Sequence, residues 1–117
     1  GGAPFAFAGL WECWTATETA LWFTEGEVIE TVTIITTVAN DKLRPIHPRM
    51  PVILPSDAFD NWLDAANDAD TVQPLLKSYP VEPMVYYRVG QTVNNSRTDS
   101  PLCIEPLNKG SGGVKAE

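Results

Sequence analysis

The sequence predicts an α+β fold with a mostly antiparallel sheet and short helices. Residues 28–38 are almost entirely β-branched, which is typical of a strand. Phe59, Trp62, Leu63 and Ala66 recur at helical spacing and would bury one face of a helix. The remaining apolar runs are short and separated by proline or glycine, so strands and short helices are expected to alternate.

In the first half of the chain, residues 5–10 are short, apolar and aromatic and predict a buried strand. Glu25-Gly26 predicts a turn before the strand 28–38. This strand has apolar residues on both faces, which is typical of a strand in the middle of a sheet and covered on both sides. In this chain alone we expect its backbone edge and one apolar face to be exposed. Residues 39–43 are expected to form one helical turn, which ends before Pro45.

The second half predicts a helix that begins at Pro55-Ser56-Asp57, with Ser56 capping its free N–H groups and Asn67-Asp68 as its stop. The chain after residue 107 is rich in glycine and predicts a flexible tail over 108–117. The other expected elements are strands at 51–54, 84–89 and 102–104 and a second short helix at 71–77.

Composition limits the classes of function. The chain has 117 residues and a net charge of −7, which argues against nucleic-acid binding by this stretch alone. No apolar run reaches the roughly 18 residues that a membrane helix needs, so no membrane partner is expected. Cys13 and Cys103 are far apart and His47 is the single histidine, which predicts reduced thiols, no metal site and no cofactor.

One loop, Arg44 to Pro51, contains three prolines and presents His47 and Arg49. An imidazole titrates near neutrality and can give or take a proton. A guanidinium two positions later can hold a phosphate with two hydrogen bonds. From the residues alone, an ordinary polar surface loop is the favoured interpretation, because His-x-Arg is a weak motif.

Several ordered motifs resemble the SOS-response-associated peptidase (SRAP) family. The similarity extends to Leu107 and implies that residues 1–107 are the C-terminal part of an SRAP domain, with a barrel-like sheet that is incomplete in this chain. The matching segments, in order, are Thr-Thr-Val-Ala-Asn at 36–40, Ile-His-Pro-Arg-Met-Pro-Val-Ile-Leu at 46–54, Trp62-Leu63, Val93-Asn94-Asn95 and Pro-Leu-Cys-Ile-Glu-Pro at 101–106.

The resemblance implies a chemistry. In this family an N-terminal cysteine attacks the aldehyde of an abasic site in single-stranded DNA, and its thiol and α-amine close a thiazolidine ring. His47 matches the active-site histidine, Thr36 a threonine near it and Arg49 a DNA-contacting arginine. Gly1 and Gly2 cannot replace the cysteine, so we expect this chain alone to be inactive and to need the missing N-terminal half as a partner.

Other conspicuous residues are expected to be structural. Residues 9–14 resemble the family's catalytic glutamate motif, but Glu12 lies too close to Thr36, so we interpret it as a rim or structural residue. Cys13 fits no family role. Core packing is expected for Trp62, whereas Trp14 and Trp22 stay undecided between packing and base stacking. The aspartates of residues 57–70 predict a solvated acidic face.

The resemblance implies a cytoplasmic, nucleoid-associated bacterial protein of the DNA damage and SOS response, with peptidase-like self-processing. One alternative is an inactive SRAP remnant that acts as a structural or partner-binding half-domain. Another is an unrelated acidic α+β interaction domain.

Overall fold

The computed structural model describes residues 2–107, and the predicted tail at 108–117 lies outside the described residues. The chain divides into two compact units, residues 1–81 and 82–117, each of which is described by itself. Among residues 2–107, no helix has the length and apolar character needed to span a bilayer.

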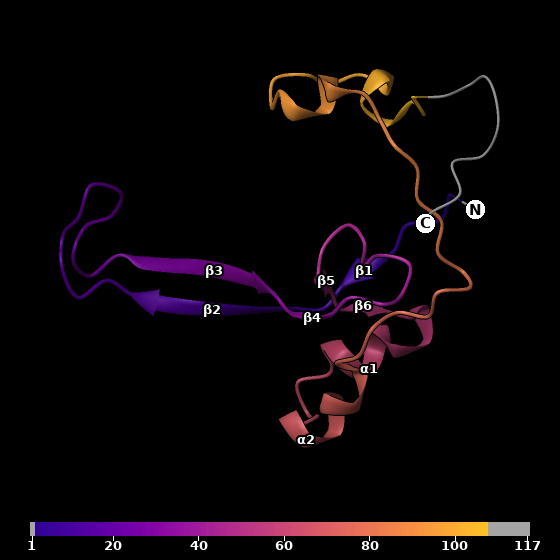
Figure 1. Ribbon diagram of the computed structural model, residues 1–117. Coiled ribbons are helices and arrows are strands. Elements are labelled where there is room, and N and C mark those ends of the chain that lie inside the picture. The colour runs from indigo at the N-terminus through magenta and orange to yellow at the C-terminus, as the bar shows by residue number, and fades with distance from the viewer. Residues whose placement is uncertain (1, 108–117) are drawn as a thin grey trace. The chain divides into compact units, whose positions relative to one another are not determined.

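All the strands described between residues 2 and 107 lie in the first unit and form three antiparallel pairs (Figure 1). The predicted α+β class with antiparallel strands is therefore confirmed. A closed barrel is absent from this described part, so the barrel-like shape that the resemblance implied is not seen there. The pairs are β1 (Ala6–Phe7) with β6 (Ile53–Leu54), β2 (Gly9–Thr15) with β3 (Val28–Ile34), and β4 (Thr36–Val38) with β5 (Arg49–Pro51).

A ring of three hydrogen bonds joins the three pairs. Ala8 N–H donates to Val52 O at 2.8 Å, Val52 N–H to Ile35 O at 2.9 Å, and Ile35 N–H to Ala8 O at 2.9 Å. Each of these residues separates two strands, β1 from β2, β3 from β4 and β5 from β6. Three segments therefore meet at one point, where each changes its pairing partner. We call Ala8, Ile35 and Val52 the junction.

The hydrophobic core surrounds this junction. Ala8 and Val52 are fully buried together with Leu54, and Ile35, Phe59, Trp62 and Leu75 pack against them. Gly9 follows directly, and a Cβ there would lie 3.1 Å from Thr33 O, which leaves little space for a side chain. The Trp62 indole N–H donates to Gly9 O at 3.1 Å, so the predicted structural role of Trp62 is confirmed.

The junction explains why the predicted strand boundaries differ from the observed ones. The expected strand 28–38 is divided at Ile35 into β3 and β4, and the expected strand 51–54 is divided at Val52 into β5 and β6. The expected strand 5–10 is divided at Ala8, and its second part continues to Thr15. Strands that switch partners have no local sequence signal at the switch, because the side-chain alternation continues through it.

The ribbon of β2 and β3 has an open backbone edge and exposed apolar side chains, as expected for residues 28–38 in this chain without the N-terminal half. Within the described residues, β3 pairs with β2 alone, and the side chains of Trp11 and Val32 are 70% and 75% exposed. The ribbon ends in a loop at the predicted Glu25-Gly26 turn, where Gly26 has a φ of +87°. Trp14 packs edge-to-face on Phe23 beside this loop, with ring centroids 5.1 Å apart, whereas Trp22 is exposed.

The helices of the first unit follow the predicted order, with different caps. The expected helix begins as a 3-10 turn, Pro55 occupies the N-cap, and Ser56 makes no capping bond, so the Ser56 prediction is wrong. The helix ends at Leu63 rather than at Asn67-Asp68, and Asp68 instead caps the next helix by accepting from Thr71 N–H at 2.9 Å. The bounds are η1 (Ser56–Ala58), α1 (Phe59–Leu63), α2 (Ala69–Val72) and η2 (Gln73–Leu75).

In the second unit, the strands expected at 84–89 and 102–104 are wrong. The described part contains two 3-10 helices, η3 (Gln91–Asn94) and η4 (Pro101–Ile104), and one isolated bridge between Val89 and Pro106. Prolines account for this result. Pro101 begins η4, and Pro106 has no N–H with which to extend the bridge into a ladder.

The junction generates a stability prediction. We expect Val52→Ala to lower the free energy of unfolding by about 2–3 kcal/mol, because two fully buried methyl groups are lost and a cavity remains. Val32→Ala removes the same atoms from an exposed site and is expected to cost less than about 1 kcal/mol. Denaturant unfolding measures both variants, and equal losses would contradict the assignment of the core.

Candidate functional site

The loop between β4 and β5 begins after Val38 and ends at Pro48, so Arg49–Pro51 of the predicted loop form β5 instead. Near the start of the loop, Asn40 is a buried polar residue. Asn40 Oδ1 accepts from Leu43 N–H at 3.0 Å, and Asn40 O accepts from Arg44 N–H at 2.9 Å. The turn spans residues 41–46 and includes Pro45, so it lies later than the helical turn expected at 39–43 and does not end before Pro45.

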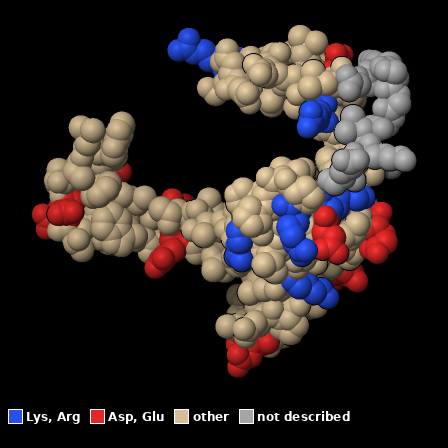
Figure 2. Space-filling model, in the orientation of Figure 1, with Lys and Arg blue, Asp and Glu red and all other residues tan. Residues whose placement is uncertain are grey.

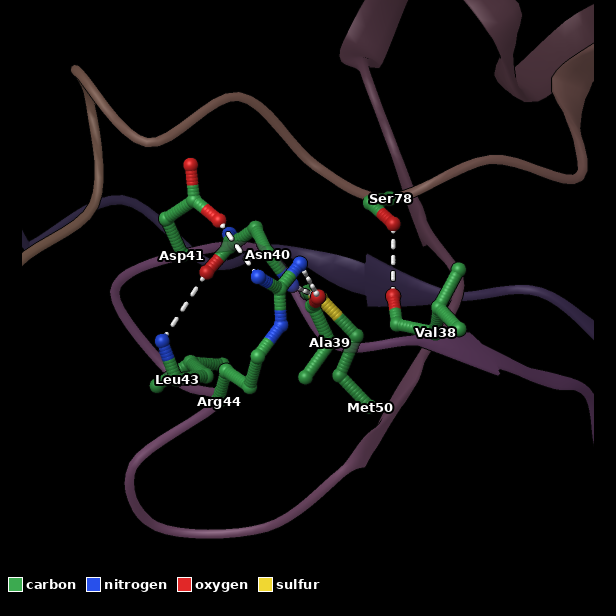
Figure 3. A network of polar contacts seen from close by, with 8 residues as sticks. All are labelled: Val38, Ala39, Asn40, Asp41, Leu43, Arg44, Met50 and Ser78. Atoms are coloured by element: carbon green, nitrogen blue, oxygen red, sulfur yellow. Dashed lines mark hydrogen bonds and ion pairs between the residues drawn. The ribbon is translucent and has the colours of Figure 1, made fainter.

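Asn40 Nδ2 donates to Tyr79 O at 2.8 Å, which anchors the turn to a segment far along the chain. Figure 3 shows the turn with Arg44, whose guanidinium contacts Asp41 at 2.9 Å and Ala39 O at 3.4 Å.

The end of the loop is fixed by backbone bonds. His47 N–H donates to Leu43 O at 3.0 Å, and Ala39 N–H donates to Pro48 O at 2.9 Å. The second bond joins the two ends of the loop directly beside the β4–β5 pair. His47 therefore lies on a loop that both of its ends hold in place.

The three predicted site residues lie together in space. The Arg49 guanidinium donates from Nη2 to Thr36 O at 2.9 Å and to Thr36 Oγ1 at 3.1 Å. Arg49 N–H donates to His47 Nδ1 at 3.0 Å. All three side chains are exposed, whereas Met50 on the opposite face of β5 is buried. We call Thr36, His47 and Arg49 the cluster.

The cluster can act chemically in two ways. An exposed imidazole with one ring nitrogen engaged leaves the other nitrogen to bind or transfer a proton. An Arg49 guanidinium that Thr36 holds from one side keeps its other N–H donors for an anion. On the face shown in Figure 2, acidic and basic side chains lie side by side and form no continuous basic surface, in agreement with the net charge of −7.

Residues that sequence reasoning set aside have other contacts in the structure. Glu12 is in the middle of β2 opposite Thr31, and Cys13 Sγ lies 3.8 Å from Glu30 Oε1 on the same ribbon. Asn95 Oδ1 accepts from Arg97 N–H at 3.0 Å, which is the backbone role typical of asparagine in a turn. Within residues 2–107, no group of three metal-ligating side chains is present.

Asn40 is the residue that sequence reasoning missed. Its signal was present in the Thr-Val-Ala-Asn segment, because an asparagine before a turn accepts from backbone N–H groups two or three residues later. The burial of that asparagine depends on residue 79, which is too distant in sequence for any local pattern to indicate.

The chain matches the family described as SOS response associated peptidase (SRAP) over residues 1–96. It belongs to the SRAP family. Among the relatives, abasic site processing protein YoqW of Bacillus subtilis is 42% identical over 102 residues, which are 86% of this chain and 42% of YoqW. Abasic site processing protein HMCES of Gallus gallus is 36% identical over 111 residues, 94% of this chain and 31% of HMCES.

A solved structure shares the SRAP-like arrangement. A crystal structure of a protein from Bacteroides thetaiotaomicron superposes with a TM-score of 0.72 and 28% sequence identity, covering 88% of this chain and 44% of that one. The chain thus spans less than half the length of the relatives and the solved structure described here. The SRAP match crosses from the first unit into the second, at residues 81–82.

The turn at Asn40 generates a prediction. We expect Asn40→Ala to lower the free energy of unfolding by about 1–3 kcal/mol, because the half-buried Leu43 N–H and Tyr79 C=O lose their hydrogen bonds to the Asn40 side chain. The control Asn61→Ala removes an exposed amide in α1 and is expected to change stability by less than about 0.5 kcal/mol. Thermal or denaturant unfolding checks both, and an unchanged Asn40→Ala variant would contradict the role of this residue.

Proposed function

We propose that this chain is the C-terminal part, residues 1–107, of an SRAP domain that links covalently to abasic sites in single-stranded DNA. The observation that supports this most directly is the cluster, because residues that match the family's site meet within hydrogen-bonding distance on one exposed surface. The relatives' names, abasic site processing proteins, support the same activity.

Each cluster residue has a proposed role. His47 transfers protons during attack on the open-chain aldehyde and during ring closure. Arg49 binds a DNA phosphate next to the lesion, using the donors that Thr36 does not engage. Thr36 has two oxygen atoms on one guanidinium nitrogen, which favours a role in holding Arg49 over a direct catalytic role.

The nucleophilic cysteine and the glutamate would come from the N-terminal half of the domain, which we propose as the partner of this chain. A thiazolidine needs a thiol and a free α-amine on one residue, and Cys13 and Cys103 are both internal. The exposed apolar side chains of the β2–β3 ribbon suit contact with such a partner. The proposed setting is the cytoplasm and nucleoid of a bacterium during the SOS response, with peptidase-like self-processing of the complete protein.

The same ribbon favours a second candidate function. An SRAP-derived half-domain without its own nucleophile would act as a structural or partner-binding module through the apolar faces of β2 and β3. This candidate needs the ribbon and does not need the cluster, so substitutions in the cluster separate the two functions.

A crosslinking assay tests the proposal. Abasic single-stranded DNA is incubated with the chain alone and with the chain supplied with the N-terminal half of the family domain, and covalent adducts are counted on a denaturing gel. We expect an adduct only in the second sample, slowed about 10²–10⁴-fold by His47→Ala, because a proton-transfer group is lost. An adduct with the chain alone, or a His47→Ala variant that reacts at the normal rate, would contradict the proposal.

A charge-matched pair controls the same assay. Arg49→Ala and Arg97→Ala both remove one exposed positive charge, but Arg97 belongs to the second unit, whereas the cluster belongs to the first. Only Arg49→Ala is expected to weaken binding to the DNA. The slope of log affinity against log salt concentration should also become less steep by about one unit. Equal effects of both variants would indicate non-specific attraction.

A further inference from the structure

His47 Nδ1 lies between the two main-chain groups of a single residue. It is 3.0 Å from Arg49 N and 3.1 Å from Arg49 O. The amide N–H can only donate and the carbonyl oxygen can only accept. When Nδ1 carries no proton, it accepts from Arg49 N–H. When Nδ1 carries a proton, it donates to Arg49 O.

Strand pairing explains why both groups of Arg49 are available. Ala39 N–H donates to Pro48 O, and hydrogen-bonded and non-hydrogen-bonded pairs alternate along an antiparallel ladder. The next pair in register, Val38 with Arg49, is thus the non-hydrogen-bonded one. The N–H and C=O of Arg49 consequently point away from β4, and β5 has no second strand neighbour among the described residues.

The other ring nitrogen is open. Within residues 2–107, His47 Nε2 has no hydrogen-bond partner, and the side chain is exposed. The backbone bonds from His47 N–H to Leu43 O and from Ala39 N–H to Pro48 O hold the loop at both ends. Main-chain atoms therefore fix the orientation of the ring. Nε2 is then the nitrogen that meets a bound ligand.

We propose that the main chain of Arg49 is a positioning group for His47, holding Nδ1 throughout a proton-transfer cycle so that Nε2 exchanges protons with the ligand. In the resting neutral ring, Nδ1 accepts from Arg49 N–H and the proton is on Nε2. The opposite tautomer would donate from Nδ1 to Arg49 O instead and would leave Arg49 N–H without its acceptor. Protonation of the ring adds a proton at Nδ1, which then donates to Arg49 O.

The imidazolium gives up a proton from Nε2. Its Nε2–H bond breaks as a ligand oxygen takes the proton, and the electron pair stays on Nε2. Nδ1 keeps its proton, which is hydrogen-bonded to Arg49 O, and Nε2 is left as a base. Uptake of the next proton at Nε2 and loss of the Nδ1 proton to water return the ring to the resting tautomer. The ligand step rests on the proposed function, whereas the arrangement of the resting ring does not.

The tautomer of His47 tests the inference without DNA. Long-range proton–nitrogen correlation spectra of the chain labelled on its single histidine report the ratio of Nε2–H to Nδ1–H rings above the titration range. The same chain in denaturant is the reference, because it has no fixed partner for Nδ1. We expect the ratio in the folded chain to exceed the reference about threefold to tenfold, as one net hydrogen bond implies. A ratio equal to or below the reference overturns the proposal.

Two substitutions at one position isolate the main-chain group. Arg49→Ala keeps the amide N–H and removes the guanidinium, whereas Arg49→Pro removes both. Proline is compatible with an edge position whose N–H lies outside the ladder, and circular dichroism confirms that the variant is folded. We expect Arg49→Ala to keep the wild-type tautomer ratio. Folded Arg49→Pro should fall to the reference or below it, because the carbonyl of residue 49 remains as an acceptor for Nδ1–H. A fall already in Arg49→Ala would assign the effect to the guanidinium and overturn the proposal. If Arg49→Pro does not fold, the test uses the other two proteins: wild type and Arg49→Ala should both have a ratio above the reference, and a ratio at the reference in either one overturns the proposal.

Discussion

The structure of the first unit depends on the three hydrogen bonds among Ala8, Ile35 and Val52. Each bond lies at the point where a chain segment leaves one strand partner and joins another. A buried backbone group without a partner is costly, so three mutually satisfied residues allow three segments to meet in a dry core. The small side chain of Ala8 and the β-branched side chain of Val52 fill the space around these bonds without exposure.

The position of the cluster follows from the junction. Thr36 is the first residue after Ile35, and Arg49 begins the short strand that ends just before Val52. Because the junction fixes where β4 and β5 start to pair, it fixes the register that places the Arg49 side chain on Thr36. The loop between the strands then needs only the Asn40 turn to bring His47 to Arg49. The buried hydrogen bonds of the junction therefore determine where the exposed cluster lies.

The sequence predicts the class, most segments and the cluster, because these depend on local patterns and on family motifs. The β-branched run at 28–38 indicates a strand, which is present as β3 and β4. Of the predicted helix face, Phe59 and Trp62 pack on the core, whereas Leu63 is exposed and Ala66 lies beyond the helix. The change of partner at Ile35 has no such signal, because it is a bond between distant residues. The strands expected in the second unit were wrong because prolines there prevent a ladder that apolar composition alone suggested.

Amide hydrogen exchange tests the central claim that the junction holds the first unit together. The junction account predicts that the amides of Ala8, Ile35 and Val52 exchange with one common opening free energy and are the slowest in residues 2–81, slower than those of the β2–β3 ribbon. If the three amides open at clearly different free energies, or exchange as fast as the ribbon amides, the junction is not the element on which the fold depends.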